Sequence, residues 1–255
     1  MNPFESYTQQ SVISLVGAGG KTSLLFYLGQ SLPWNCLLTT TTKVGTDQIQ
    51  LADCITSFHA FRSDPARVSA NKMTWVSPDP AKPERKVEGF SLEQFSQFAE
   101  IAAKIPMPIL VEADGAHCLH LKAPAENEPV IPDETTHVLD VIGIDIVGKR
   151  LGQETVHRLP HFMNITKSKE GDLIDAEMII RAILHPSGGF KNAPEQSRKI
   201  VVLNQADTPD KIEQAEKLAD LVLPRGIDEV WITCLSPDRD KNDRGILKTY
   251  QSWKI

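Results

Sequence analysis

The chain has 255 residues, of which 41% are hydrophobic and 24% charged, with a net charge of -6 at pH 7. This acidic balance argues against nucleic acid or an anionic membrane as the main partner. The sequence has no apolar run near the ~20 residues that span a bilayer, and its N-terminus lacks a secretory signal. The four cysteines form no C-x-x-C pair. Reduced thiols and a cytoplasmic location are therefore expected.

Short β-branched runs alternate along the chain with amphipathic stretches. In chain order we expect strands at residues 12–16, 36–40, 108–111, 138–142, 199–203 and 227–233, the last of the series. Helices are expected between them at residues 22–30, 91–104, 172–184 and 209–223. Ser91 is the expected N-cap of the second helix, and Pro209 suits the first position of the fourth. The alternation predicts an α/β fold with a mostly parallel sheet and helices on both faces, similar to a P-loop NTPase.

The domain organisation follows from the absence of a clear linker. We expect a single nucleotide-binding α/β domain over residues 1–255, with long loops at 63–86 and 115–133 that are rich in proline and charge. Long loops inside a compact domain are usually functional, so these two are expected to contact a substrate.

A glycine-rich turn follows the first expected strand and leads into a helix. Its residues are Gly17, Ala18, Gly19, Gly20, Lys21, Thr22 and Ser23. Such a turn directs backbone N–H groups toward phosphates, and the helix N-terminus favours negative charge. Lys21, expected to be exposed, would reach the β- and γ-phosphates, and the hydroxyl of Thr22 would bind Mg²⁺.

The spacing of this turn differs from the standard G-x-x-x-x-G-K-[ST] loop, because Leu15 stands where the first glycine is required. The shorter G-x-x-G-K-T pattern is that of Mur-type ligases. A nucleotide-binding turn is predicted in either case, so transfer chemistry with ATP remains an alternative to hydrolysis.

Polar residues follow two further expected strands. Thr40, Thr41 and Thr42 end the second strand, where hydroxyl groups can complete a Mg²⁺ shell or contact the γ-phosphate. The strand at 108–111 leads into Glu112, Asp114 and Gly115, the outline of a Walker-B strand and a variant of the D-x-x-G box. Either Glu112 or Asp114 would hold Mg²⁺, and with Lys21 they are the candidate catalytic residues.

The strand at 199–203 leads into a candidate guanine-reading box, Asn204-Gln205-Ala206-Asp207. An aspartate at the last position accepts two hydrogen bonds from guanine, whereas adenine would leave this carboxylate unpaired. Gln205 replaces the usual lysine but still offers an aliphatic stem to cover the base. The box favours GTP over ATP. Capping of the next helix by Asp207 and Thr208 is the competing interpretation.

Several further side chains have no fixed role. His117, Cys118 and His120 could take a borderline metal, but satisfied or exposed histidines are the expected case, as for His157 and His161. Arg158 is a better candidate for a phosphate or substrate contact. The segment from Lys122 to Glu128 would either line a substrate site or cross the surface as a rigid loop.

Taken together, these segments resemble the YqeC-like family. The resemblance rests on VGAGGKTSLL, LLTTTTKV, ILVEADGAHCLHLKAPAENEPVIP, VIGIDIVGK and VVLNQAD. The family is described as an accessory protein of selenium-dependent molybdenum hydroxylases. The resemblance implies a cytoplasmic nucleotide-binding protein that acts in the maturation of such an enzyme, with that hydroxylase or a cofactor-maturation protein as partner.

Three functions are consistent with these motifs. The favoured one is a slow Mg²⁺-dependent GTPase or NTPase that acts as an accessory factor. A small-molecule kinase or Mur-like ligase that uses ATP is the second, and a non-catalytic nucleotide-dependent scaffold or chaperone is the third.

Overall fold

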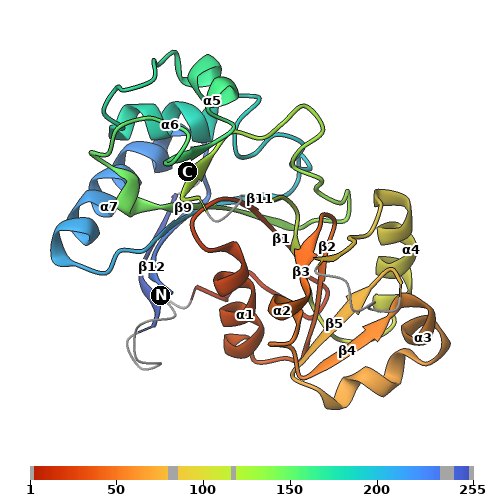
Figure 1. Cartoon of the computed structure of the whole chain (residues 1–255). Helices are drawn as coiled ribbons and strands as arrows, with labels where there is room; N and C mark the ends of the chain where they lie inside the picture. The colour runs from red at the N-terminus through yellow and green to blue at the C-terminus, as the bar shows by residue number, and fades with distance from the viewer. Residues whose placement is uncertain (1–2, 80–85, 116–118, 236–243, 253–255) are drawn as a thin grey trace.

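The computed structural model describes residues 3–79, 86–115, 119–235 and 244–252 of the chain (Figure 1). Its main sheet consists of β1 (Val12–Gly17), β2 (Cys36–Thr40), β4 (Cys54–Ser57), β5 (Met73–Ser77), β7 (Ile109–Glu112), β9 (His137–Gly143), β11 (Arg198–Asn204), β12 (Glu229–Cys234) and β13 (Gly245–Gln251). The nine strands lie in the order β13-β12-β11-β9-β1-β7-β2-β5-β4. Neighbouring strands are parallel apart from β12 and β13, which run antiparallel.

The remaining elements are shorter or lie outside this sheet. The helices are α1 (Lys21–Ser31), α2 (Thr46–Ile49), α3 (Phe58–Ser63), α4 (Leu92–Ala102), α5 (Leu159–Thr166), α6 (Ala176–Leu184) and α7 (Pro209–Val222). Short 3₁₀ segments occupy Pro65–Ala70, Ile144–Ile146 and Leu223–Arg225. Two small ladders pair β3 (Val44–Gly45) with β6 (Lys86–Val87) and β8 (Leu121–Lys122) with β10 (Val156–His157).

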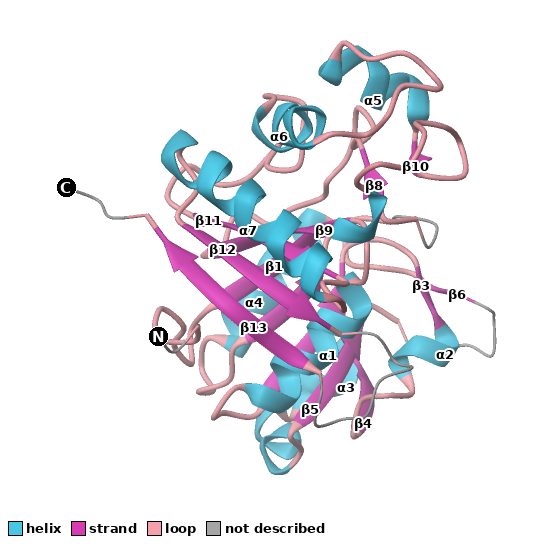
Figure 2. Cartoon of the chain, turned by 90° about the vertical axis from the view of Figure 1, so that its left-hand side faces the viewer, coloured by secondary structure: helices cyan, strands magenta, loops and turns pink. Residues whose placement is uncertain are grey.

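Helices cover both faces of the sheet. Successive residues of a strand point to opposite faces, and in most of these strands apolar residues lie on both faces. On β1, Ile13 packs into the apolar cluster that contains Leu24 and Leu28 of α1. Its neighbour Val12 packs on the other face with the cluster of α3 and α4. Further along that second face, α6 and α7 cover β11 and β12. Figures 1 and 2 show α6 and α7 grouped over one half of the sheet and α3 and α4 at its other end. The predicted α/β layering is confirmed.

The order of the strands reverses at β1, which lies between β7 and β9. After β1 the chain builds β2, β4 and β5 on one side and returns through β7, which pairs with β1. The next strand of the sheet, β9, pairs with the opposite edge of β1. In open parallel sheets, ligands bind where the strand order reverses in this way. The turns that follow β1, β7 and β9 therefore meet at the position where a ligand site is expected.

Most predicted elements are observed, with shifts at their ends. The expected strand at 36–40 coincides with β2, and Ser91 caps α4 in a capping box with Gln94. The helix expected from residue 172 begins only at Ala176, because Asp175 accepts from the backbone N–H of Met178 and forms the N-cap. These agreements depend on local patterns, apolar spacing and caps.

The segment 115–133 is a loop over its described residues, as expected, apart from the two-residue strand β8. Two expectations are wrong. The segment 63–86 is not only a loop, since it contains β5, which pairs with β2 and β4 inside the sheet. The strand at 227–233 is not the last, because β13 follows it as an antiparallel edge strand. Among the helices that the structure describes, none is long and apolar enough to cross a membrane.

The cap of α4 provides a test of local stability. Replacing Ser91 with Ala removes the acceptor for the backbone N–H of Gln94, so we expect unfolding free energy to fall by about 1 kcal/mol in urea titrations. Ser96→Ala, at an exposed position inside the same helix, is the matched control and should be neutral or slightly stabilising. Equal effects of the two changes would contradict the capping role.

Candidate nucleotide site

The turn between β1 and α1 has a backbone that glycine alone adopts easily. Gly17, Gly19 and Gly20 have φ values of 88°, 91° and 115°, in the left-handed region. The space around the turn is also closed. A Cβ on Gly17 would lie 2.4 Å from Oδ1 of Asp140, and a Cβ on Gly19 would lie 2.3 Å from the backbone nitrogen of Gly143. Side chains at these positions would therefore displace the end of β9.

The first N–H groups of this turn donate to acceptors within the protein. Gly17 donates to Oδ2 of Asp114 at 3.0 Å, Ala18 to the carbonyl of Val141 at 2.7 Å and Gly19 to that of Leu119 at 3.0 Å. As at the start of every α-helix, the first N–H groups of α1 have no acceptor within the helix, and no side chain caps this helix. Donors for an anion are thus concentrated at Gly20, Lys21, Thr22 and Ser23.

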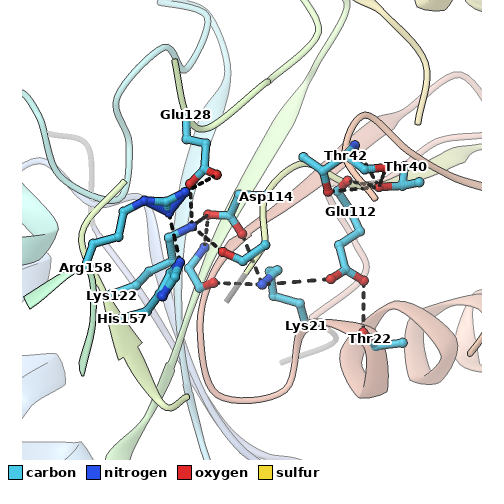
Figure 3. Close-up of polar contacts among 12 residues, drawn as sticks. Lys21, Thr22, Thr40, Thr42, Glu112, Asp114, Lys122, Glu128, His157 and Arg158 are labelled. Atoms are coloured by element: carbon cyan, nitrogen blue, oxygen red, sulfur yellow. Dashed lines mark hydrogen bonds and ion pairs between the residues drawn. The ribbon is translucent and has the colours of Figure 1, made fainter. Parts of the chain in front are cut away.

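Lys21, the first residue of α1, is buried and folds back over the turn. Its Nζ donates to the carbonyl of Gly17 at 2.8 Å and lies 3.1 Å from Oδ1 of Asp114 and 3.9 Å from Oε1 of Glu112 (Figure 3). Burial would lower the pKa of Lys21, but the two carboxylates outweigh it and the pKa is raised. The expectation of an exposed lysine is wrong, because only 4% of this side chain is accessible. The ammonium is held charged above the end of β1.

Glu112 forms a second pair at the beginning of α1. The hydroxyl of Thr22 donates to its Oε2 at 2.9 Å. Burial raises the pKa of this carboxyl group, against the opposing effects of Lys21 and Thr22. A carboxylate beside a hydroxyl supplies hard oxygen ligands of the kind that Mg²⁺ binds. These residues fit a divalent cation.

Asp114 lies two residues beyond Glu112 and is shared by two lysines. Oδ1 faces Lys21, and Oδ2 lies 2.9 Å from Nζ of Lys122, which comes from β8. Lys122 also lies 3.0 Å from Oε2 of Glu128 and donates to the carbonyl of Gly115 at 2.6 Å. Arg158 completes the row with Nη2 at 2.7 Å from Oε1 of Glu128. Figure 3 shows this row of alternating charges extending from Glu112, beside Thr22, to Arg158.

The threonine run lies beside Glu112 but is used for backbone contacts. Thr40 donates to the carbonyl of Glu112 at 2.8 Å and Thr41 to that of Val130 at 2.6 Å. The hydroxyls of Thr40 and Thr42 lie 3.3 Å apart. These bonds hold the end of β2 against β7. The hydroxyls are therefore close to the candidate site but already have partners.

The predicted base-reading residues divide into two groups. Asn204 is buried and donates to the carbonyl of Gly19 at 2.7 Å, while its oxygen accepts from Thr233 and from the N–H of Leu235. It fixes the glycine turn to the ends of β11 and β12. Asp207 forms a pair with Lys211 at 2.6 Å on the partly exposed side, and Gln205 has a positive φ of 64°. Asn204 thus contacts the glycine turn directly.

Asp140, in the middle of β9, is a buried acid that the sequence motifs did not indicate. It lines a cavity of about 10 Å³, roughly one water molecule, together with Gly17, Asp114 and Lys122. Burial raises the pKa of Asp140 to about 7, Asp114 adds to this, and Lys122 and Lys21 oppose it. An aspartate in a strand that otherwise reads as apolar was the one available sequence signal.

His120 also acquires a partner that sequence reasoning missed. Its Nδ1 lies 2.6 Å from Oδ1 of Asp145, which follows β9 and also pairs with Lys149. His120, with Lys149, holds the pKa of Asp145 at about 2 against the opposing effect of burial. His117 and Cys118 lie outside the described residues. Within the described part of the chain, no group of three His, Cys, Asp or Glu side chains converges as a metal site.

The sequence is similar to that of a known protein over most of its length. A family model described as "YqeC protein" matches residues 13–160. The chain belongs to the YqeC family. It is 33% identical over 241 residues to a protein of Escherichia coli strain K12 named "Uncharacterized protein YqeC", and the match covers 87% of this chain and 86% of that protein. No solved structure matches the chain. The matched region contains the glycine turn, Glu112, Asp114, Lys122 and Arg158.

The raised pKa of Asp140 predicts how stability depends on pH. A carboxyl group with a raised folded-state pKa stabilises the fold at low pH and loses this contribution as pH rises from its usual value, 3.8, to about 7. Asp140→Asn should remove this dependence. The unfolding free energy of the variant relative to the parent should then rise by up to about 1.4 kcal/mol per pH unit in this window.

Urea titrations between pH 4 and pH 8 provide the measurement. His137, whose pKa burial lowers to about 4, changes stability in the opposite direction, but it is present in both proteins and cancels in the difference. A variant-to-parent difference that is independent of pH would contradict the role assigned to Asp140.

Proposed function

We propose that this YqeC-family protein has a P-loop NTPase-type fold and binds a nucleotide with Mg²⁺ at the start of α1. The observation that carries the proposal is the convergence of Lys21 and Thr22 on Glu112 and Asp114 at the end of β7. A lysine and a hydroxyl at a helix N-terminus, opposite carboxylates from the neighbouring strand, are the parts that a phosphate loop requires.

The phosphates would lie on the first turn of α1. Gly20, Lys21, Thr22 and Ser23 offer backbone N–H groups there, and the helix dipole favours negative charge. The N–H groups of Gly17, Ala18 and Gly19 already have acceptors, so their contribution would be to shape the turn. Lys21 would exchange its carboxylate contacts for phosphate oxygens, most simply those of the β- and γ-phosphates.

Mg²⁺ would be held by Thr22 and Glu112. The alternative ligand, Asp114, is buried and neutralised by Lys21, Lys122 and the N–H of Gly17, whereas Glu112 has a hydroxyl neighbour and remains partly accessible. Mg²⁺ keeps several waters and needs few protein ligands. The bound cation would neutralise charge on the phosphates, and Glu112 would orient one of its waters.

The base would lie beside the turn that follows β11. Asn204 links this turn to Gly19, which brings Gln205 and Asp207 to the side of the phosphate loop. Asp207 would have to exchange Lys211 for the N1–H and amino groups of guanine. On this basis we favour GTP over ATP.

The activity that suits these parts is slow NTP hydrolysis coupled to an accessory role. Family membership, together with the resemblance stated for its motifs, supports a cytoplasmic factor in the maturation of a selenium-dependent molybdenum hydroxylase. That enzyme or another maturation protein would be the partner.

A second candidate function follows from the length of the phosphate loop. Gly17 stands only three positions before Gly20, the spacing of the short G-x-x-G-K-T loop of Mur-type ligases. This favours ATP-dependent transfer of phosphate to a small molecule. Transfer to an added acceptor would distinguish it from hydrolysis, and nucleotide binding without turnover would indicate a scaffold.

Lys21→Met tests the phosphate site. Calorimetric titration with Mg²⁺·GTP and Mg²⁺·ATP should show binding to the parent and a loss of at least about tenfold in the variant, because a charge-assisted phosphate contact is removed. Lys217→Met, which breaks only an exposed pair on α7, is the matched control and should bind like the parent. Unchanged affinity in a folded Lys21→Met variant would refute the phosphate site.

Asp207→Asn tests the base. The variant should lose affinity for Mg²⁺·GTP, retain its affinity for Mg²⁺·ATP and gain affinity for xanthosine triphosphate, whose 2-oxo group accepts a hydrogen bond from the amide. Competition titrations with the three nucleotides measure this. If GTP and ATP weaken equally, the guanine assignment is wrong and the ATP-dependent alternative is favoured.

A further inference from the structure

Lys122 lies outside the phosphate loop but shares a carboxylate with its lysine. Its Nζ is 2.9 Å from Oδ2 of Asp114, while Nζ of Lys21 is 3.1 Å from Oδ1 of the same group. The side chains of Lys122 and Asp114 are each 2% exposed. The sequence motifs give Lys122 no role of its own beyond the two alternatives stated for the segment from Lys122 to Glu128.

Nucleotide binding creates an electrostatic problem at Asp114. If Lys21 turns to phosphate oxygens, Asp114 loses one of its two ammonium partners while remaining buried. An unpaired buried charge is strongly unfavourable, and this penalty would weaken nucleotide binding. Asp114 would also hold Lys21 in competition with the phosphates. A second cation on Oδ2 of Asp114 lowers both the cost of the buried charge and the competition for Lys21.

We propose that Lys122 is a positioning residue that holds the charge of Asp114 when Lys21 moves to the nucleotide. This inference rests on the proposed nucleotide site and extends it. Lys122 does not contact the nucleotide in this exchange. It acts through Asp114, which also keeps its hydrogen bond from the N–H of Gly17 and so holds the glycine turn in place.

The other charged residues of the row determine how fully the charge of Lys122 is available to neutralise Asp114. Glu128 competes for the same ammonium at 3.0 Å, and Arg158 neutralises Glu128 from the partly exposed side at 2.7 Å. The signs of the substitution effects should therefore alternate. Losing a cation, Lys122 or Arg158, weakens nucleotide binding, whereas losing the competing anion, Glu128, preserves or strengthens it.

The decisive experiment is a double-mutant cycle on the full chain, titrated with Mg²⁺·GTP and Mg²⁺·ATP. Lys122→Met should weaken binding by about tenfold or more, because Asp114 then retains Lys21. Lys122→Met combined with Asp114→Asn should return affinity to within a few-fold of the parent, because no buried carboxylate competes for Lys21. Lys122→Arg should also bind almost like the parent.

Lys191→Met is the matched control, because Lys191 anchors the same loop through the carbonyls of Ala125 and Glu126 and pairs with no carboxylate among the described residues. It should leave affinity unchanged. If Lys122→Met does not fold, Arg158→Met and Glu128→Gln test the exchange through their opposite shifts.

The outcomes separate the two proposals. Parent protein that binds neither nucleotide overturns the proposed function, and the exchange with it. Parent binding with additive losses in the double variant, or with shifts of the same sign at Arg158 and Glu128, overturns the exchange alone. Recovery of affinity in the double variant supports the exchange when urea titrations show that Lys122→Met alone is folded under the binding conditions, since repair of a purely structural defect would raise stability without changing the affinity of an already folded protein.

Discussion

The carboxyl edge of the sheet depends on how one buried carboxylate is neutralised. Asp114 accepts from the N–H of Gly17 and faces Lys21 and Lys122, so it joins β7 to the glycine turn, to α1 and to β8. Without these partners a charge would be buried in an apolar sheet, at a cost of several kcal/mol. The contacts that shape the turn and the contacts that hold its lysine are therefore parts of one electrostatic arrangement.

Local patterns in the sequence were sufficient for much of the fold and part of the site. β-branched runs indicated β1, β2 and β9, and Ser91 indicated the beginning of α4, because burial and capping act within a few residues. The glycine turn with Lys21 and Thr22 follows from the same reasoning. Either Glu112 or Asp114 was expected to share Mg²⁺ with Thr22, and the structure places Oε2 of Glu112 at 2.9 Å from the Thr22 hydroxyl.

What the sequence could not indicate depends on contacts between distant segments. The pair of Lys122 and Asp114 forms only because β8 folds back over the end of β7, and Arg158 joins the row only through its pairing with Glu128, thirty positions away. The strand β5, next to the edge strand β4, was missed because its short run lies between polar segments and is stabilised by pairing with β2 and β4. The burial of Lys21 has the same origin, since its carboxylates come from β7.

The hydrogen bonds of Gly17, Ala18 and Gly19 have a consequence for the energetics of binding. Because strand β9, Leu119 and Asp114 satisfy these N–H groups, the turn is shaped by the protein itself. A ligand arriving at α1 would not have to order the backbone, so little conformational entropy would be lost on association. Its heat-capacity change would then report the surface it covers rather than coupled folding.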